Sequence, residues 1–238
     1  MTIPPDLAAA IRRSTPTVVF DLDGCLVHSS PDIAAALNAA MAKHGQSFTV
    51  AEVEQMIGDG LGALYDKALA ARGISLPAAE VKAEFDAFYA RYAAEPAVRS
   101  QARAWVAEVA RALKDNGAHV SVCTNKVEPI ALAIMDQLGL SASVHATVGH
   151  VAGRAKKPDP EPMRLAVEKS GGDLRRAVMV GDSKADLGAG RSVGMPVVLV
   201  TGGYGTDDVR TLGADYLAED RDALLAAILD ASARRAAA

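Results

Sequence analysis

The chain has 238 residues, half of them hydrophobic, and its 25 basic and 29 acidic side chains give a formal net charge of -4. This length accommodates one sizeable core with a smaller appended domain, or a single large domain, and the absence of any basic run longer than a dipeptide argues against nucleic acid as a partner. Because no apolar stretch approaches the roughly 20 residues that span a bilayer and the first residues lack the pattern of a signal peptide, we expect a cytoplasmic protein with no membrane partner.

The first predicted strand is the apolar run 17–20, which is followed directly by Asp21-Leu22-Asp23-Gly24. Because side chains alternate along a strand, Asp21 and Asp23 point to the same side, while Leu22 packs on the opposite side. Two like charges so close favour a proton on one carboxyl unless a cation intervenes, so the pair can divide nucleophilic from acid/base work. Gly24 allows the backbone to turn away from the strand end. Taken alone, the motif is equally compatible with an acidic surface loop.

The next stretch, 31–94, contains no convincing strand and is predicted to be helical throughout. Ser30-Pro31-Asp32 has Pro in the first turn of a helix, and Thr49-Val50-Ala51-Glu52 has the spacing of a capping box that opens a second. Gly58-Asp59-Gly60 interrupts the chain before a third helix, and a fourth fills 77–92. This helical segment is inserted directly after the first strand, so it starts and ends beside the two aspartates. A segment in this position is well placed to act as a lid over them.

After Pro96, short β-branched runs alternate with Ala/Leu-rich stretches, which is typical of a parallel sheet with crossover helices. The fold class is therefore predicted to be α/β. Together with the strand that precedes Asp21, the predicted strands are Val18–Phe20, Val120–Cys123, Val144–Val148, Val178–Val180, Val197–Val200 and Asp215–Leu217. The predicted helices lie near 103–115, 128–138, 160–170, 184–193 and 221–235.

Three polar segments in this part of the chain lie next to predicted strands or helices. Thr124 follows one strand, Lys157 precedes a Pro-initiated helix, and Asp182 and Asp186 follow another strand, with Ser183 expected to begin the helix between them. Separately, Thr124 is better explained as a helix cap and Lys157 as a solvated surface residue. In open α/β sheets, however, ligands bind outside the carboxyl ends of the strands, and here three strands end in Asp, Thr and Asp. We therefore expect these residues to meet at one site.

Together these residues resemble the motifs of the haloacid dehalogenase (HAD) superfamily of aspartate-nucleophile phosphohydrolases, from Thr17 onward. The motifs occur in the order Asp21/Asp23, Thr124, Lys157 and Asp182/Asp186. Within that superfamily, segments that look like those of phosphoglycolate phosphatases are Phe20–Gly24, Val27–Asp32, Ile57–Gly60, Thr124–Lys126, Lys157–Pro160 and Gly181–Ser183. The resemblance implies a Rossmann-like core with an inserted all-helical cap. The domains we expect are an N-terminal extension (1–16), the core (17–29 and 97–238) and the cap (30–96).

The resemblance also implies a mechanism and a magnesium cofactor. Asp21 would attack phosphorus and form an aspartyl phosphate, and Asp23 would protonate the leaving oxygen and then take a proton from the hydrolytic water. The implied Mg²⁺ ligands are the Asp21 side chain, the Asp23 backbone carbonyl and the Asp182 side chain. Asp186 would hold water on the ion or orient Lys157.

Phosphate binding and substrate choice are implied in the same way. Thr124, Asn125 and nearby backbone amides would bind the phosphoryl oxygens, and Lys157 would neutralise charge on the phosphate and on Asp21. The cap loop 58–60 is the implied specificity segment, with Asp59 expected to face solvent because an inward carboxylate would repel an acidic substrate. A cap cation should pair with the substrate carboxylate, and the candidates are Lys43, Lys67, Arg72, Lys82 and Arg91.

The leading hypothesis is a magnesium-dependent phosphatase that converts 2-phosphoglycolate to glycolate and phosphate. Its partner would be a small phosphate ester, and the protein would be a monomer or a homodimer. A phosphosugar or pyrophosphate phosphatase, or a phosphomutase, is the alternative among enzymes. A non-catalytic phosphate-binding module is disfavoured, since all the catalytic residue types are present and receiver-type signalling domains have no inserted helical block.

Overall fold

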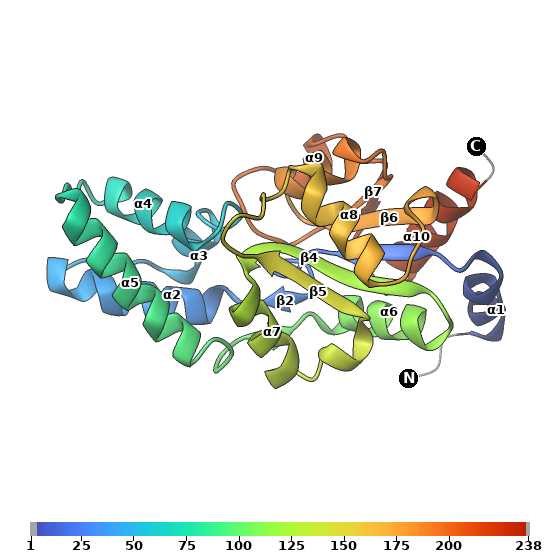
Figure 1. Cartoon of the computed structure of the whole chain (residues 1–238), viewed down its shortest axis with the longest axis horizontal. Coiled ribbons are helices and arrows are strands. Elements are labelled where there is room, and N and C mark those ends of the chain that lie inside the picture. Colours follow the sequence, from blue (N-terminus) through green and yellow to red (C-terminus); the bar gives the residue numbers. More distant parts are fainter. Residues whose placement is uncertain (1–3, 237–238) are drawn as a thin grey trace.

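A computed structural model describes residues 4–236 and shows a two-part molecule (Figure 1). Both described ends lie in the part that contains the sheet, and helices α2 to α5 project from the opposite end. Residues 1–3 of the predicted N-terminal extension and residues 237–238 lie outside the described part. Within the extension, α1 (Pro5–Ser14) packs against α10 (Arg221–Ala236). The extension is therefore anchored to the core.

The core is a six-stranded parallel sheet in the order β5-β4-β1-β6-β7-β8. The strands are β1 (Thr17–Phe20), β4 (His119–Val127), β5 (Ala146–His150), β6 (Ala177–Gly181), β7 (Val197–Val200) and β8 (Tyr216–Ala218). β1, β6 and β7 are buried along their whole length, as expected of parallel strands covered on both faces. The six predicted strands are therefore all present, and the α/β fold class is confirmed.

Helices cover both faces of this sheet (Figure 1). On one face lie α8 (Pro160–Lys169) and α9 (Lys184–Ser192), which pack on β4, β5, β6 and β7. On the other lie α6 (Ala104–Asp115), α7 (Glu128–Gln137) and α10. The alternation in β1 matches this division, because Val18 and Phe20 belong to one buried cluster and Val19 to the other.

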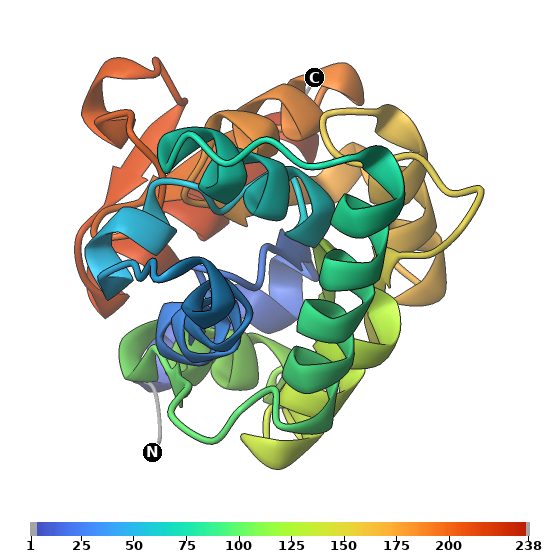
Figure 2. The same cartoon turned by 90° about the vertical axis from the view of Figure 1, so that its left-hand side faces the viewer.

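Four helices inserted between β1 and β4 form the all-helical cap: α2 (Ser30–Met41), α3 (Val50–Glu54), α4 (Leu61–Ala71) and α5 (Ala78–Ala94). Figure 2 shows them in front of the core. Inside the cap, the Tyr65 ring stacks on Phe88 with centroids 5.6 Å apart, and Phe85 meets both rings edge-on. The cap therefore has an aromatic interior of its own. The domain bounds 29/30 and 96/97 remain our proposal.

Two chain segments join the cap to the core, and they pair as a short antiparallel ribbon of β2 (Val27–His28) and β3 (Gln101–Ala102). The sequence did not predict this ribbon. The buried carboxylate of Asp32 accepts hydrogen bonds from the backbone N–H of Arg99 and of Ser100 and from the Ser100 hydroxyl, at 2.6–3.1 Å. The first turn of α2 is thereby fastened to the segment by which the chain returns to the core.

Several element bounds differ from the predictions. β4 extends to Val127 rather than ending at Cys123, and its pairing with β5 is irregular between these two residues. Thr124 therefore lies within β4 and not beyond it. β5 begins two residues later than predicted, at Ala146, where its pairing with Ser121 of β4 starts. No helix in the described part of the chain is long and apolar enough to cross a membrane.

Candidate active site

The carboxylate of Asp21 lies at the C-terminal end of β1, where the strand leaves the sheet. Its backbone N–H donates to the Val180 carbonyl of β6 at 2.8 Å, which fixes its position between two strands. Its Oδ1 accepts a hydrogen bond from Lys157 Nζ at 2.6 Å. Burial raises the pKa of Asp21 to about 7, against the lowering effect of Lys157. The group therefore needs further positive charge to be fully ionised near neutral pH.

A second carboxylate, that of Asp186, holds Lys157 in place. Lys157 Nζ also donates to Asp186 Oδ1 at 2.6 Å. The other oxygen, Oδ2, accepts from the Ser183 hydroxyl at 2.6 Å and from the backbone N–H of Asp182 and of Ser183, each at 3.1 Å. Ser183 caps α9 in a capping box with Asp186. Both oxygens of Asp186 are thus engaged in positioning Lys157 and the 182–183 turn.

Asp182 contributes an unpartnered oxygen to the same site. Its Oδ2 accepts from the backbone N–H of Tyr204 at 2.7 Å, while its Oδ1 is buried with no hydrogen-bond partner. Burial, and then the neighbouring Asp186 and Asp21, raise the pKa of Asp182. A buried oxygen left without a partner is costly, and a cation would compensate it.

The surroundings of Asp182 are shaped for close approach of small groups. A Cβ on Gly24 or on Gly203 would lie 2.1 Å or 2.2 Å from Asp182 Oδ2, and Gly24 also has a φ of +85°. One carboxylate oxygen from each of Asp21, Asp182 and Asp186 lies within 4.8 Å of the others. This all-oxygen set, with a free Asp182 oxygen, fits a hard divalent cation such as Mg²⁺.

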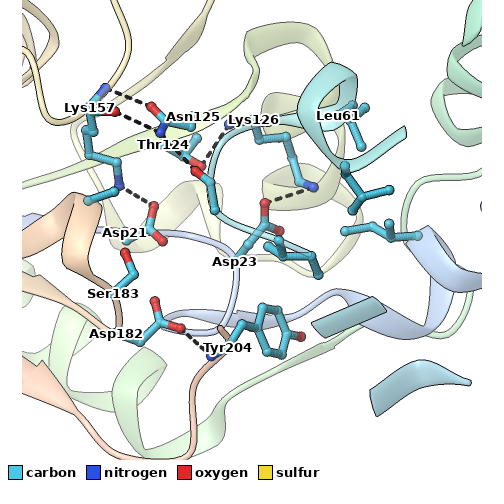
Figure 3. Close-up of a pocket in the computed structure, with 16 residues that line it drawn as sticks. Asp21, Asp23, Leu61, Thr124, Asn125, Lys126, Lys157, Asp182, Ser183 and Tyr204 are labelled. Carbon is cyan, nitrogen blue, oxygen red and sulfur yellow. Dashed lines mark hydrogen bonds and ion pairs between the residues drawn. The ribbon is translucent and has the colours of Figure 1, made fainter. Parts of the chain in front are cut away.

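Asp23 lies beside Asp21 but has different partners (Figure 3). Its Oδ1 accepts from the Ser29 hydroxyl, and its Oδ2 lies 2.9 Å from Lys126 Nζ. In Figure 3, Lys157 and Lys126 lie on opposite sides of the two aspartates. The two carboxylates are therefore held by different lysines, which separates their environments as the sequence pattern suggested.

Thr124 and Asn125 line the cavity next to these groups, on β4. Asn125 Nδ2 donates to the Gly58 carbonyl of the cap at 2.9 Å and to the Lys157 carbonyl at 3.1 Å, and its Oδ1 accepts from the Lys157 N–H at 2.8 Å. Both N–H groups of the Asn125 side chain are therefore engaged by protein acceptors, and the phosphate contact at this position stays a prediction. The side chain joins β4 and the segment around Lys157 to the cap.

The cap loop 58–60 closes over the site. Gly58 and Gly60 line the same cavity as Asp21 and Asp23, and the cavity has a volume of about 40 Å³. The Asp59 side chain is 63% exposed and pairs with Lys67 Nζ at 2.6 Å. The expectation that Asp59 faces solvent when the cap is closed agrees with this arrangement.

The expected cap cation is not found at the cavity. Four of the five candidates form ion pairs within the cap: Lys43 with Glu84, Lys67 with Asp59, Arg72 with Glu52 and Lys82 with Asp86. Arg91 is exposed and does not line the cavity. In this arrangement the four paired cations join parts of the cap to one another, and the pairing of a cap cation with a substrate carboxylate stays a prediction.

Sequence reasoning missed three residues of the site. Lys126 and Tyr204 line the cavity, and Ser29 donates to Asp23. The Tyr204 hydroxyl accepts from the Ser30 N–H at 3.0 Å, so this residue joins the Asp182 turn to the start of the cap. Lys126 carried a signal, since it directly follows the Thr124-Asn125 pair, and Ser29 lies in the Val27–Asp32 segment that resembles the family. The Ser29 contact with Asp23 spans six residues, whereas Tyr204 contacts Asp182 from 22 residues away.

The fold and site agree with what comparison with known proteins finds. The sequence model of the haloacid dehalogenase-like hydrolases matches residues 15–194. A phosphoglycolate phosphatase of Caulobacter vibrioides is 40% identical over 84% of this chain and 85% of its own length, and one of Agrobacterium fabrum is 32% identical over 95% and 98%. A crystal structure described as a predicted phosphoglycolate phosphatase from Haemophilus somnus superposes with a TM-score of 0.81 at 28% identity, covering 90% of this chain and 98% of that one.

Fold and site together define a hydrolase built on a parallel α/β sheet with a helical cap. The match to the family extends over well over half of the chain, and it includes the strands that carry Asp21, Thr124 and Asp182. The chain belongs to the haloacid dehalogenase-like hydrolase family.

Proposed function

We propose that the protein is a magnesium-dependent phosphatase that hydrolyses 2-phosphoglycolate to glycolate and phosphate. The observation that carries the proposal is the pairing of Asp21 with the buried Lys157 at the end of β1, in a chain up to 40% identical to proteins named phosphoglycolate phosphatase. The cap residues Gly58 and Gly60 line the cavity together with Asp21 and Asp23, and this arrangement favours a small ester. The enzyme would act in the cytoplasm, as a monomer or a homodimer, without a nucleic-acid or membrane partner.

In the proposed first step, a carboxylate oxygen of Asp21 attacks phosphorus and the bond from phosphorus to the ester oxygen breaks. Asp23 gives its proton to the departing glycolate oxygen. Lys157, held by Asp186, offsets negative charge on the phosphoryl group and keeps Asp21 oriented. Splitting the displacement in this way leaves an aspartyl phosphate on Asp21.

In the second step, Asp23 takes a proton from water, which attacks the phosphorus and releases phosphate and the Asp21 carboxylate. Backbone amides around Thr124 are suited to bind the phosphoryl oxygens in both steps. A Mg²⁺ ion held by the side chains of Asp21 and Asp182 and the Asp23 backbone carbonyl would offset repulsion between the carboxylates and a phosphate dianion. The closed cap keeps bulk water away from the intermediate.

The test is phosphate release from 2-phosphoglycolate by wild type and by Asp21→Asn. The amide occupies the same volume but cannot attack phosphorus, so we expect turnover to fall by at least about a thousandfold while the melting temperature stays close to that of wild type. Undiminished turnover in Asp21→Asn would exclude the nucleophile. A panel with pyrophosphate and phosphosugars separates the proposed substrate from the alternatives, and a wild type that prefers one of those esters would exclude 2-phosphoglycolate.

A further inference from the structure

We propose that Lys126, a residue of the core and not of the cap, binds the carboxylate of the leaving group. This inference rests on the proposed function and names the residue that selects its substrate. Among the described residues that line the cavity, the cationic side chains are those of Lys126 and Lys157. Lys157 is held between Asp21 and Asp186 at 2.6 Å from each. Lys126 is therefore the cation in the cavity that remains to pair with a second anionic group of the substrate, its carboxylate.

The ammonium of Lys126 is buried and only partly satisfied. Its side chain is 1% exposed, and its Nζ lies 2.9 Å from Asp23 Oδ2 and 2.9 Å from the Tyr92 hydroxyl. An ammonium has three N–H donors, so these two partners leave one for a ligand. A buried cation next to an apolar wall gains more from an anionic partner than an exposed one does.

That apolar wall comes from the cap. Ile33 of α2 and Leu61 and Leu64 of α4 line the cavity, and Figure 3 shows Leu61 on the same side of it as Lys126. These side chains exclude water and offer no hydrogen bond. A carboxylate that enters this part of the cavity thus depends on Lys126 for its charge partner, and a neutral group does not.

The position of Lys126 relative to Asp23 matches the shape of 2-phosphoglycolate. In the proposed mechanism Asp23 contacts the ester oxygen, and in this substrate the carboxylate carbon is two bonds beyond that oxygen. Lys126 Nζ is a direct neighbour of Asp23 Oδ2. A group that touches the ester oxygen on one side and an ammonium on the other must be short, so the spacing favours a two-carbon acid over longer acids.

Tyr92 makes this contact depend on the closed cap. It is a buried residue of α5, and its hydroxyl accepts from Lys126 Nζ, which belongs to β4 of the core. Closing the cap therefore fixes the ammonium at the same time as it brings the apolar wall over the leaving group. Specificity then arises in the closed state, where the site excludes water.

The experiment compares Lys126→Met with wild type on two esters, 2-phosphoglycolate and 2-hydroxyethyl phosphate. The second ester replaces the carboxylate with a neutral alcohol and leaves as an alkoxide of similar basicity, so both need the same proton from Asp23. Both esters share any loss that arises through Asp23, so we expect kcat/KM of the variant to fall at least about twentyfold further on 2-phosphoglycolate than on 2-hydroxyethyl phosphate. Equal losses on both esters would overturn the proposal, because they would mean that Lys126 only positions Asp23.

Lys156→Met is the matched control. Lys156 Nζ donates to the Asp59 carbonyl at 3.1 Å, so it also joins core and cap, but it does not line the cavity. Its removal should affect both esters equally. If Lys126→Met fails to fold, Lys126→Gln keeps a donor for Asp23 without the charge, and the same comparison applies. Wild type without activity on 2-phosphoglycolate would defeat the proposed function, whereas active wild type with parallel losses defeats only the role of Lys126.

Discussion

At Asp182 one oxygen is hydrogen-bonded and the other is buried without a partner. Three carboxylates, those of Asp21, Asp182 and Asp186, lie within reach of one ion, and Lys157 supplies a single positive charge to two of them. Excess buried negative charge opposes folding unless a cation compensates it. We therefore expect the folded protein to be less stable without a divalent ion than with one bound at this site.

This expectation leads to a prediction for Asp182→Asn. In wild type, Mg²⁺ at about a hundred times its dissociation constant should raise the melting temperature by roughly 5–10 °C. In the variant we expect little increase, because the unpartnered carboxylate oxygen is lost. Without Mg²⁺, the variant should melt at the same temperature as wild type or higher, since one of three like charges is removed.

Thermal denaturation with and without Mg²⁺ measures this effect independently of activity. Asp207→Asn is the control, because its carboxylate pairs with Lys184 outside the three-carboxylate cluster. An unchanged Mg²⁺ response in Asp182→Asn would exclude Asp182 as a ligand.

The sequence indicated the residues that directly follow a strand at the edge of the sheet, such as Asp21 and Asp182, and it indicated Thr124, although β4 continues past that residue to Val127. It did not indicate Ser29 or Tyr204, because their contacts with Asp23 and Asp182 depend on how the cap segments and the 201–205 loop fold back over the sheet. No periodicity or spacing in the chain encodes those contacts.

At the level of elements, continuous β-branched runs predicted the buried strands well, because a parallel strand covered on both faces needs apolar residues at every position. The same reasoning missed β2 and β3. A strand of two residues has no alternation to detect, and Gln101 is exposed. Their pairing depends on Asp32, whose side chain binds the backbone of residues 99–100 from a distant part of the sequence.

Inside the cap, the side chain of Glu84 on α5 forms hydrogen bonds and ion pairs with residues of other cap elements. This buried carboxylate accepts from the Tyr65 hydroxyl of α4 at 2.8 Å and pairs with Lys43 at 2.5 Å and His44 at 2.9 Å, just after α2. Burial raises the pKa of Glu84, but the hydrogen bonds from His44, Lys43 and Tyr65 outweigh it and lower the pKa to about 2. Three cap elements therefore depend on one ionised group.

From this pKa we predict a pH-dependent effect of Glu84→Gln. A carboxyl group whose pKa is lower in the folded state stabilises the fold fully above its ordinary value of 4.5, and this contribution is lost as the pH falls toward about 2. At neutral pH the variant should lose on the order of 2 kcal/mol of unfolding free energy. The difference from wild type should shrink as the pH falls from about 4.5 to about 3.

Denaturant unfolding at several pH values measures this difference. Glu80→Gln, an exposed change on the same helix, serves as the control and should be nearly neutral throughout. A difference between wild type and Glu84→Gln that stays constant with pH would show that charge at Glu84 is not what joins the cap elements.

At the scale of the whole molecule, the cap and the core meet through several polar contacts around the cavity. Asn125 binds the Gly58 carbonyl, Lys156 binds the Asp59 carbonyl, Lys126 binds the Tyr92 hydroxyl, and the Gly205 N–H donates to the Glu54 carbonyl at 3.1 Å. In each contact the cap offers oxygen, from backbone or hydroxyl, and the core donates. In these four contacts the cap supplies the acceptors and the core the donors, whereas at the base of the cap the Ser30 N–H donates to the Tyr204 hydroxyl of the core.

Within the cap loop 58–60, the two glycines differ in how closely they approach the core. A Cβ on Gly58 would meet nothing within 4 Å, although its φ of +138° still disfavours other residues. A Cβ on Gly60 would lie 3.2 Å from the Asn125 carbonyl and 3.1 Å from Lys156 Nζ, and the φ of Gly60 is +92°. A side chain at position 60 would therefore be in tight contact with Asn125 and Lys156 of the core when the cap is closed.

We predict that Gly60→Ala impairs closure beyond its cost in stability. Gly73 is the matched position, because it is a cap glycine with a φ of +64° and no atom within 4 Å of an added Cβ. Both alanine variants should lose roughly 1 kcal/mol or somewhat more of stability from the unfavourable backbone conformation. Only Gly60→Ala should lose kcat/KM on 2-phosphoglycolate, by about tenfold, since weakened closure leaves the leaving group and the aspartyl phosphate less well enclosed. Melting temperatures and kcat/KM for both variants separate the two effects, and a Gly60→Ala enzyme as active as Gly73→Ala would mean that the loop does not bear on the core during turnover.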